Sequence, residues 1–417
     1  MVLKPDIRIN EERLKSLLDG INGFGQNPAT GGYDRIGFSD ADMAVRKWFA
    51  DRMRSEGLVV RMDGAANVWG RLGPCDGAAV VAGSHLDTVP SGGAYDGALG
   101  VAAALEAVLS LRDSGFVPRR AIEVLATSEE EGRFGGMLGS QAIAGLLNEE
   151  WLENARDSEG VLLADAMRLL ELEPRKALGA RRTKDDIAAF IELHIEQGPV
   201  LEAGGLDIGI VHTISGMASL SGQLIGRANH SGTTPMDMRA DAFAGLADFA
   251  ATLPALISSL GTEATRITIG HVELEPNFPH TIPGSAGFTI ILRDADAASM
   301  QRLASALETS LCESAARHRL KHRLDAITWL DPVRLDAGLA DIVQAAAVRL
   351  SLSYRLMESG AGHDAQTMQT LCPSALIFVP SVDGISHAPE EQTEWQAIIK
   401  GANLLAAALF ELSGAPT

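Results

Sequence analysis

The chain has 417 residues, of which 46% are hydrophobic and 21% charged, and its formal net charge is −19. This length predicts two domains rather than one core, and the hydrophobic fraction is that of an ordinary globular protein. The acidic charge disfavours nucleic acid and anionic membrane surfaces as partners, because both would be repelled.

The termini and cysteines bear on the compartment. The first twenty residues are polar and amphipathic, without the apolar core of a signal peptide, and we expect no later run to be apolar enough to span a membrane. The three cysteines, Cys75, Cys312 and Cys372, are scattered and lack the spacing of a metal site. These features predict a cytoplasmic protein whose metal ions, if any, are held by histidine and carboxylate side chains.

The first half of the chain alternates predicted helices and strands. Apolar spacing predicts two amphipathic helices within residues 10–57. Further elements are expected, in chain order, as strands at 58–62, 67–72 and 78–82, a helix at 101–111 and a strand at 121–126. This order predicts an α/β domain with a mainly parallel sheet, right-handed crossovers and flanking helices.

The pattern changes at about residue 210. A charged helical stretch at 140–185 and a strand at 188–193 still belong to the first pattern. Period-two alternation then predicts strands at 216–225, 267–274 and 286–292, with helices at 241–259 and 297–318 between and after them. The sheet pattern resumes at 375–379, so we expect an α+β module inserted into the first domain.

The stretch at residues 80–100 carries the strongest chemical signal. His85 and Asp87 lie at or just past the carboxyl end of the buried strand at 78–82, where ligands bind in open α/β sheets. Side chains two residues apart on a strand point the same way, so the Asp87 carboxylate is expected to accept the second ring N–H of His85. Asp96 follows a glycine-rich turn. The alternatives are a core histidine at position 85 and a helix N-cap at position 96.

Five residues with metal-ligand chemistry lie near predicted strand ends: His85, Asp96, Glu130, His194 and His387. Imidazole and carboxylate ligands without thiolate suit a pair of borderline divalent cations, with Asp96 as the bridging ligand. Glu129 would remain free of metal and act as the general base for a bridging water. The alternative for residues 129–131 is a solvated acidic loop.

Six blocks of the sequence resemble the M20 metallopeptidase-type amidohydrolases, in the family's order. Within that family they are most similar to the hydantoinase/carbamoylase branch, which includes N-carbamoyl-L-amino-acid hydrolases, allantoate amidohydrolases and β-ureidopropionases. The blocks are GSHLDTVPSGGAYDGALGV, TSEEEGRFG, HIEQGPVLE, ANHSGTTPMDMRADA, SGAGHDA and FVPSVDGISHAPEE. The resemblance implies a catalytic domain at 1–213 and 331–417 and a lid or dimerisation domain at 214–330.

The resemblance also assigns the metal ligands. His85 and His194 would hold one ion, Glu130 and His387 the other, and Asp96 would bridge them. Asp87 would support His85, and Glu129 would be the base. Zn²⁺ or Mn²⁺ is expected, and Co²⁺ or Ni²⁺ would suit the same ligands.

The inserted module carries two residues that match functional positions of the family. His230 is similar to the histidine that polarises the scissile carbonyl, which in this family can reach the active site of the partner subunit. Arg293 matches the arginine that grips the substrate carboxylate. Further substrate contacts are expected from Gln197, Gly360 and His363.

One position departs from the family pattern. Thirteen residues ahead of Arg293, where the family commonly has asparagine, this chain has His280. Either the nearby Asn277 substitutes for the missing amide or His280 itself donates to the substrate carboxylate. The substrate-binding signature is therefore altered.

The resemblance implies a homodimeric enzyme that hydrolyses the ureido C–N bond of an N-carbamoyl-L-amino acid to the amino acid, CO₂ and ammonia. The alternatives are an allantoate amidohydrolase or β-ureidopropionase and, third, an aminoacylase or dipeptidase. His194 and the Arg133-Phe134-Gly135 block weigh against the third, because the family's ordinary peptidases usually have a carboxylate where His194 stands. A catalytically silent binding protein is a further alternative, although neither a predicted ligand nor the predicted base is missing.

Overall fold

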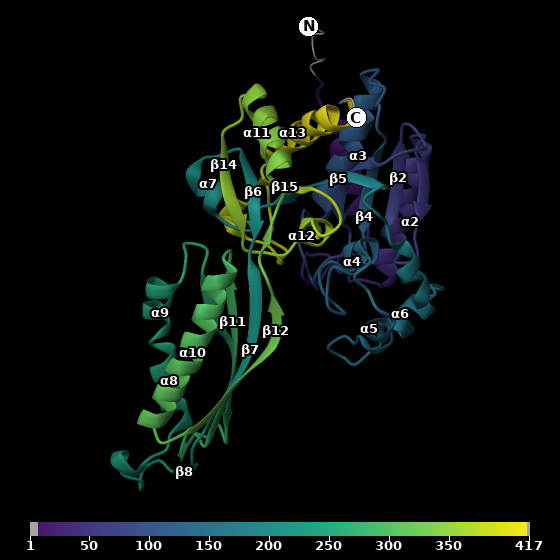
Figure 1. Ribbon diagram of the computed structural model, residues 1–417. Coiled ribbons are helices and arrows are strands. Elements are labelled where there is room, and N and C mark those ends of the chain that lie inside the picture. The colour runs from purple at the N-terminus through teal and green to yellow at the C-terminus, as the bar shows by residue number, and fades with distance from the viewer. Residues whose placement is uncertain (1–6, 415–417) are drawn as a thin grey trace. The chain divides into compact units, whose positions relative to one another are not determined.

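The computed structural model describes residues 7–414 and divides into two compact units (Figure 1). Unit 1 contains the described residues up to His212, Leu335–Met357, and those from His363 onward, whereas unit 2 contains Thr213–Arg334 and Glu358–Gly362. The sequence had suggested the second part of the catalytic domain for residues 331–334 and 358–362. The structure groups the first of these segments with unit 2 because β13, Val333–Arg334, pairs with Ile214 and Thr213.

Unit 1 is built on a mainly parallel sheet flanked by helices, which confirms the predicted fold class. The neighbouring pairs β4–β3, β3–β5 and β5–β15 are parallel. Antiparallel pairing adds β2 and β1 on one side and β6 on the other. The strands of the sheet are, in order, β1 Val59–Met62, β2 Val68–Leu72, β4 Ile122–Thr127, β3 Ala79–His85, β5 Ile187–Ile195, β15 Ser374–Val379, β6 Ile208–Ile214 and β13, and β14, Tyr354–Ser359, also pairs with β6.

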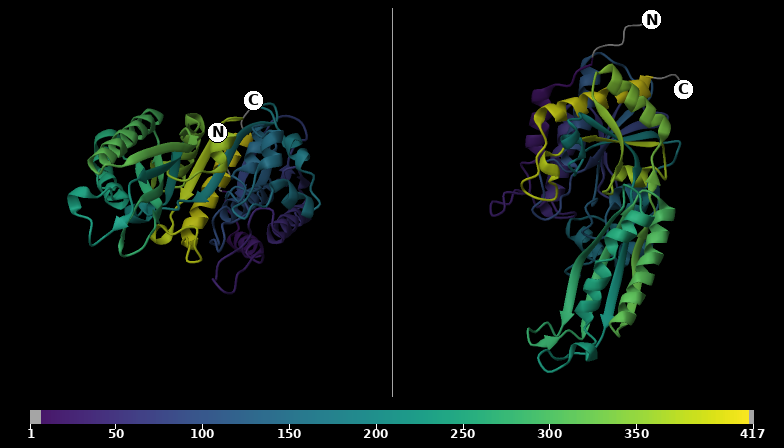
Figure 2. Two further views of the ribbon diagram at one scale, coloured as in Figure 1. Left: turned by 90° about the horizontal axis from the view of Figure 1, so that it is seen from below. Right: turned by 90° about the vertical axis from the view of Figure 1, so that its left-hand side faces the viewer.

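The central strands are buried along their whole length because helices cover both faces of the sheet. Helix α3, Ala98–Asp113, packs on β3, β4 and β5 and contacts α13, Trp395–Gly414. Its alanine-rich sequence is buried from Ala98 to Leu111 and allows close approach to both neighbours. The remaining long helices of this unit are α1 Glu11–Ile21, α2 Asp40–Ser55 and α11 Ala337–Arg349. The right-hand view of Figure 2 shows α13 in yellow lying across the sheet.

The charged stretch after β4 forms short helices around a small separate core that includes Phe134 and Leu138. These helices are α4 Leu138–Ala144, α5 Glu149–Asn154, α6 Leu163–Leu169 and η1 Pro174–Ala180. Three further short helices, α7 Val200–Gly204, α12 Asp364–Met368 and η3 Val382–Gly384, follow strands of the sheet or lie beside them. The loops of unit 1 are thereby packed rather than extended.

Unit 2 is a four-stranded antiparallel sheet with helices on one face (Figures 1 and 2). Its strand order is β12 Lys321–Leu330, β7 Gly216–Ile225, β11 Ser285–Asp294 and β9 Arg266–Glu275. Burial alternates strictly along β11, so every second side chain packs under α8 Ala242–Ala250, α9 Leu253–Leu260 and α10 Ala297–Arg317. A separate ladder joins β8, Asn229–His230, to β10, Thr281–Ile282, and η2, Met236–Met238, follows β8.

Two predictions about apolar helices were wrong. The single helix expected at 241–259 is divided at residues 251–252, just ahead of Pro254 at the start of α9. By length and composition, Ala242–Leu260 and α13 each qualify as a membrane span, which contradicts the expectation that no run does. The first stretch is two short helices, and α13 packs in the core of unit 1, so both belong to packed layers.

Candidate metal centre

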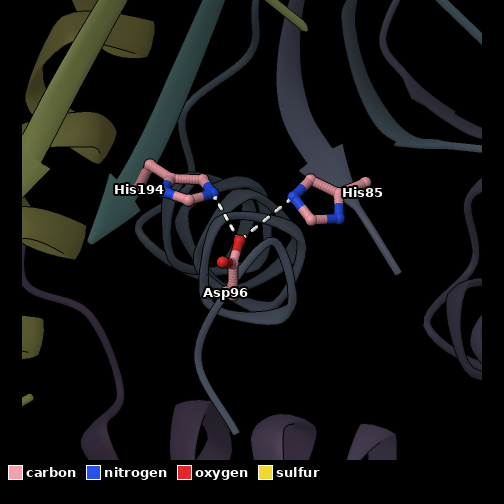
Figure 3. A group of neighbouring side chains, drawn as sticks. All are labelled: His85, Asp96 and His194. Carbon is pink, nitrogen blue, oxygen red and sulfur yellow. Dashed lines mark ion pairs between the residues drawn. The ribbon is translucent and has the colours of Figure 1, made fainter. Parts of the chain in front are cut away.

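Three buried side chains from three segments meet at the carboxyl ends of β3 and β5. His85 ends β3, His194 is the second-last residue of β5, and Asp96 lies two residues before α3. Asp96 Oδ1 is 3.3 Å from His85 Nε2 and 3.0 Å from His194 Nε2 (Figure 3). The strands are parallel neighbours, so their ends adjoin and the two imidazoles converge on one carboxylate oxygen.

The other oxygen of Asp96 faces a second group of potential ligands. Asp96 Oδ2 is 3.3 Å from His387 Nε2, and His387 Nε2 is 3.4 Å from Glu131 Oε2. In each group the three potential ligand atoms lie within 4.8 Å of one another, close enough to hold a metal ion. One carboxylate is therefore shared between two sets of ligands, one deeply buried and one that includes the half-exposed His387.

Backbone carbonyls fix the orientation of the two buried imidazoles. His85 Nδ1 is 3.0 Å from the carbonyl oxygen of Asp87, and His194 Nδ1 is 2.9 Å from that of Ile195. A carbonyl can only accept, so each ring carries a proton on Nδ1 and directs Nε2 toward Asp96, and the Gly97 N–H also lies 3.3 Å from His194 Nε2.

The predicted role of the Asp87 carboxylate is wrong, because the main chain of Asp87 contacts His85. Its Oδ2 accepts from the Glu131 N–H at 3.1 Å, and its Oδ1 lies 3.6 Å from the buried guanidinium of Arg46. The Asp87 carboxylate thus supports the loop that carries Glu131, whereas the Asp87 carbonyl orients the ring of His85.

In the acidic loop at residues 129–131, the structure moves the predicted contacts by one residue toward the C-terminus. Glu129 was predicted as the base, but its carboxylate is buried away from both groups and accepts the Phe134 N–H at 2.6 Å. Its φ of 53° turns the chain so that the two following glutamates reach the site. Glu130, predicted as a ligand, has Oε2 3.7 Å from His85 Nε2, whereas Glu131 is the residue beside His387.

Burial and mutual proximity change the acidity of these groups. Burial raises the pKa of Glu130 well above its ordinary value, and it raises the pKa of Glu131 to about 7, with a further contribution from the charge of Asp96. Burial also opposes ionisation of Asp96, but the surrounding histidines, His194 first, hold its pKa well below the usual range. The hydrogen bond to Asp96 raises the pKa of His387 to about 9. This concentration of acidic groups favours cations at the site.

Two predicted substrate contacts lie beside the candidate metal ligands. Gln197 Nε2 donates to Asp96 Oδ2 at 2.8 Å and is 3.3 Å from His387 Nε2. His363 is buried behind His194, with ring centroids 4.5 Å apart. Glu192, His194 and His363 also form a ligand-type group, but both oxygens of Glu192 already accept hydrogen bonds, from Ser84 Oγ at 2.7 Å and Ala365 N at 2.9 Å.

The predicted residues of unit 2 fall into two groups at opposite ends of its sheet. Arg293, near the end of β11, donates from Nη1 to the carbonyl oxygen of Gly360 at 2.8 Å. At the other end, Thr281 of β10 pairs with His230, and the His280 carbonyl accepts the Ser231 N–H at 3.0 Å. Asn277 lies in the adjoining turn, with a φ of 43°. The ten residues of β11 separate these groups by roughly 25–30 Å.

The ring of His230 is held in one tautomer. Its Nδ1 accepts the N–H groups of Gly232 at 3.0 Å and Thr233 at 3.2 Å. The ring proton is consequently on Nε2, which leaves this exposed histidine with a hydrogen-bond donor available to a ligand.

Several residues at the site were not singled out from the sequence. Glu131 occupies the ligand position expected for Glu130, and Ser386 and Glu391 contact Asp96 or its loop. All three stand inside the motif blocks, beside residues that were singled out. Only a backbone conformation distinguishes which of the consecutive glutamates faces the site.

Comparison with known sequences identifies relatives that cover nearly all of the chain. The pattern of the family described as Peptidase family M20/M25/M40 matches residues 81–411, a range that includes every residue of the two ligand groups. The N-carbamoyl-L-amino-acid amidohydrolase of Paenarthrobacter aurescens is 36% identical over 90% of this chain and 92% of its own length. The allantoate amidohydrolase of Escherichia coli is also 36% identical, over 96% and 98%, and the ureidoglycolate hydrolase of Oryza sativa is 34% identical, over 97% and 85%.

Solved structures give the same result for the fold. A hydantoinase/carbamoylase family amidase from Burkholderia multivorans superimposes with a TM-score of 0.92 at 32% identity, over 99% of this chain and 100% of that chain. A second such amidase, from Burkholderia ambifaria, has a TM-score of 0.89 at 33% identity, over 99% of each chain. Both units are therefore shared with these amidases.

Proposed function

The chain belongs to peptidase family M20/M25/M40, in the hydantoinase/carbamoylase branch, and we propose that it hydrolyses the ureido C–N bond of an N-carbamoyl-L-amino acid. Membership makes it a hydrolase of non-peptide C–N bonds in linear amides. The products would be the amino acid and carbamate, which decomposes to CO₂ and ammonia.

The observation that carries the proposal is the placement of Asp96, with each oxygen directed at a different set of ligands. His85 and His194 would hold one divalent cation, Glu131 and His387 a second, and Asp96 would bridge them. Imidazole and carboxylate ligands fit Zn²⁺ or Mn²⁺, and also Co²⁺ or Ni²⁺. Two bound cations would supply Lewis acidity and lower the pKa of the attacking water.

Glu130 replaces Glu129 as the proposed general base. Its carboxylate reaches the buried ligand group, yet Glu131 serves the ligand position beside His387. Glu130 would take the proton of the attacking water and then deliver it to the nitrogen of the leaving amine. Its raised pKa suits a group that must hold this proton between the two steps.

Recognition and oxyanion stabilisation would come from unit 2. Arg293 would bind the substrate carboxylate through its planar guanidinium, and His230 would donate from Nε2 to the developing oxyanion. The two side chains lie at opposite ends of one sheet, so one copy cannot offer both to the same small molecule. We therefore propose a homodimer in which a second copy supplies His230.

Allantoate is the second candidate substrate, followed by N-carbamoyl-β-alanine. His280 stands where the family commonly has asparagine, and the allantoate amidohydrolase of Escherichia coli is as similar to this chain as the N-carbamoyl-L-amino-acid amidohydrolase is. An imidazole in place of an amide changes the donors offered to the substrate carboxylate.

The test is ammonia release by purified protein loaded with Mn²⁺ or Zn²⁺. The panel contains N-carbamoyl-L-amino acids, N-carbamoyl-β-alanine, allantoate and N-acetyl amino acids, the last followed by amine release, with a Glu130→Gln variant as the inactive control. Turnover of N-carbamoyl-L-amino acids supports the proposal, and preference for allantoate selects the second candidate. Turnover of the acetyl compounds alone, or of none, contradicts both.

A further inference from the structure

Glu391 connects the two loops that carry the second ligand group. Its buried carboxylate accepts the N–H groups of Tyr95 at 2.9 Å and Asp96 at 3.0 Å through Oε1. Its Oε2 accepts the hydroxyl of Ser386, the residue before His387, at 2.8 Å. A Cβ built on Gly93 would lie 2.1 Å from Glu391 Oε1, so the loop that contains Gly93 packs directly against the carboxylate.

The position of Oε1 requires an acceptor. The two N–H groups that it binds lie just ahead of α3, which begins at Ala98, where the partial positive charge of the helix end favours an anion. In a variant with a side-chain amide at position 391, the amide oxygen would therefore accept from these N–H groups. The opposite orientation would place the NH₂ group, a donor, against two other donors. Its NH₂ group would then face the Ser386 hydroxyl.

The Ser386 hydroxyl has two acceptors within reach but only one hydrogen. Its Oγ is 2.8 Å from Glu391 Oε2 and 3.2 Å from Asp96 Oδ2, the oxygen that faces His387. A hydroxyl donates to one acceptor at a time. Asp96 Oδ2 already accepts from Gln197 Nε2 at 2.8 Å, so a further hydrogen bond from Ser386 would compete with a cation for the remaining lone pair.

We infer that Glu391 is a positioning residue that takes the hydrogen of Ser386 and so leaves Asp96 Oδ2 available to the cation of the second group. The inference rests on the proposed two-ion centre. An amide at position 391 would donate to Ser386 Oγ, and the hydroxyl would then turn its hydrogen to Asp96. Glu391 therefore changes the affinity of the second group for its cation only by way of the Ser386 hydroxyl. Removal of that hydroxyl is expected to abolish the effect.

The test is metal binding to four metal-free proteins: wild type, Glu391→Gln, Ser386→Ala and the double variant. Calorimetric titration with Mn²⁺ gives the affinities, and elemental analysis after dialysis gives the stoichiometry. Glu391→Gln is expected to lose roughly 10- to 100-fold in affinity for one of two ions, the range typical of groups that support metal ligands. Ser386→Ala should remain within about 3-fold of wild type, and the double variant should regain most of the loss.

A purely structural role for Glu391 predicts a double variant at least as weak as Glu391→Gln, and that result overturns the inference. Unchanged affinity in a folded Glu391→Gln protein also overturns it. If Glu391→Gln does not fold, Ser386→Ala alone decides, because a loss above 10-fold would mean that the hydroxyl supports the ion. Fewer than two ions in wild type would instead reject the proposed metal centre on which the inference rests.

Discussion

The polar groups of unit 1 and those of unit 2 are organised in opposite ways. In unit 1 the ligand atoms are within 4.8 Å of one another, and the two buried imidazoles are oriented by backbone carbonyls. In unit 2, His230 is exposed at one end of the sheet and Arg293 stands near the other. The proposed metal ligands and base are preassembled within unit 1, whereas the two side chains proposed to contact the substrate from unit 2 lie far apart.

The difference follows from the two kinds of sheet. Parallel neighbours such as β3 and β5 end at the same edge, so residues that follow them meet. The antiparallel strands of unit 2 place the two ends of β11 at opposite edges. Variants of the proposed ligands or base in unit 1 should abolish turnover, whereas variants of Arg293 in unit 2 should weaken substrate binding.

The largest effect is expected for Glu130→Gln, which removes the proposed base and keeps the shape. We expect kcat to fall by roughly 10²- to 10⁴-fold with the metal content unchanged. Glu129→Gln is the matched control, because that side chain bonds to the Phe134 N–H away from the ligands, and its kcat should stay within about 10-fold of wild type. Steady-state kinetics and elemental analysis check both. A larger loss of kcat in Glu129→Gln than in Glu130→Gln would instead support Glu129 as the base.

An intermediate effect is expected for Arg293→Lys, which keeps the charge but removes the planar fork. We expect kcat/KM to fall roughly 10- to 100-fold, mainly through KM, with metal affinity unaffected. Arg266→Lys is the control, because Arg266 stands opposite Arg293 on β9 and has no proposed role. Equal losses in the two variants would contradict substrate binding by Arg293.

The smallest effect on activity is expected for Glu129→Gln, whose main effect concerns stability. Burial raises the pKa of Glu129 from 4.5 to about 8, so the folded protein keeps a proton that the unfolded chain releases. Stability is therefore lost as pH rises from about 4.5 to about 8, and the loss stays constant above that range. Glu129→Gln should be within about 1 kcal/mol of wild type at pH 5 and stabilising by roughly 5 kcal/mol at pH 9, as a shift of this size implies.

Urea unfolding at the two pH values measures this difference. Glu263→Gln, which removes an exposed carboxylate, serves as the control. If the free energy of unfolding of Glu129→Gln changed with pH as that of wild type does, Glu129 would not be buried as a neutral acid.

Much of the candidate metal centre was predictable because its residues lie at or after the ends of strands. His85, Asp96, His194 and His387 stand where the strand pattern and motif blocks indicate, and the structure brings them together. The fold class is confirmed because hydrophobic patterns distinguish buried parallel strands from alternating antiparallel ones. Strand β12 was missed, since its burial alternates only weakly.

The acidic loop was not predictable in the same way. Three consecutive glutamates have identical propensities, and the choice of Glu131 over Glu130 depends on the positive φ at Glu129. Likewise, the contact of His85 with the Asp87 carbonyl rather than its carboxylate depends on the path of the main chain after β3. Patterns of residue type do not encode such local backbone choices.

The central claim is that Asp96 bridges two cations, with Glu131 and not Glu130 as a ligand. Anomalous diffraction from crystals of the Mn²⁺-loaded protein tests it most directly. The account predicts two peaks joined by Asp96, one beside His85 and His194 and one beside Glu131 and His387, with Glu130 free of metal. A single peak, or a peak ligated by Glu130 in place of Glu131, would contradict it.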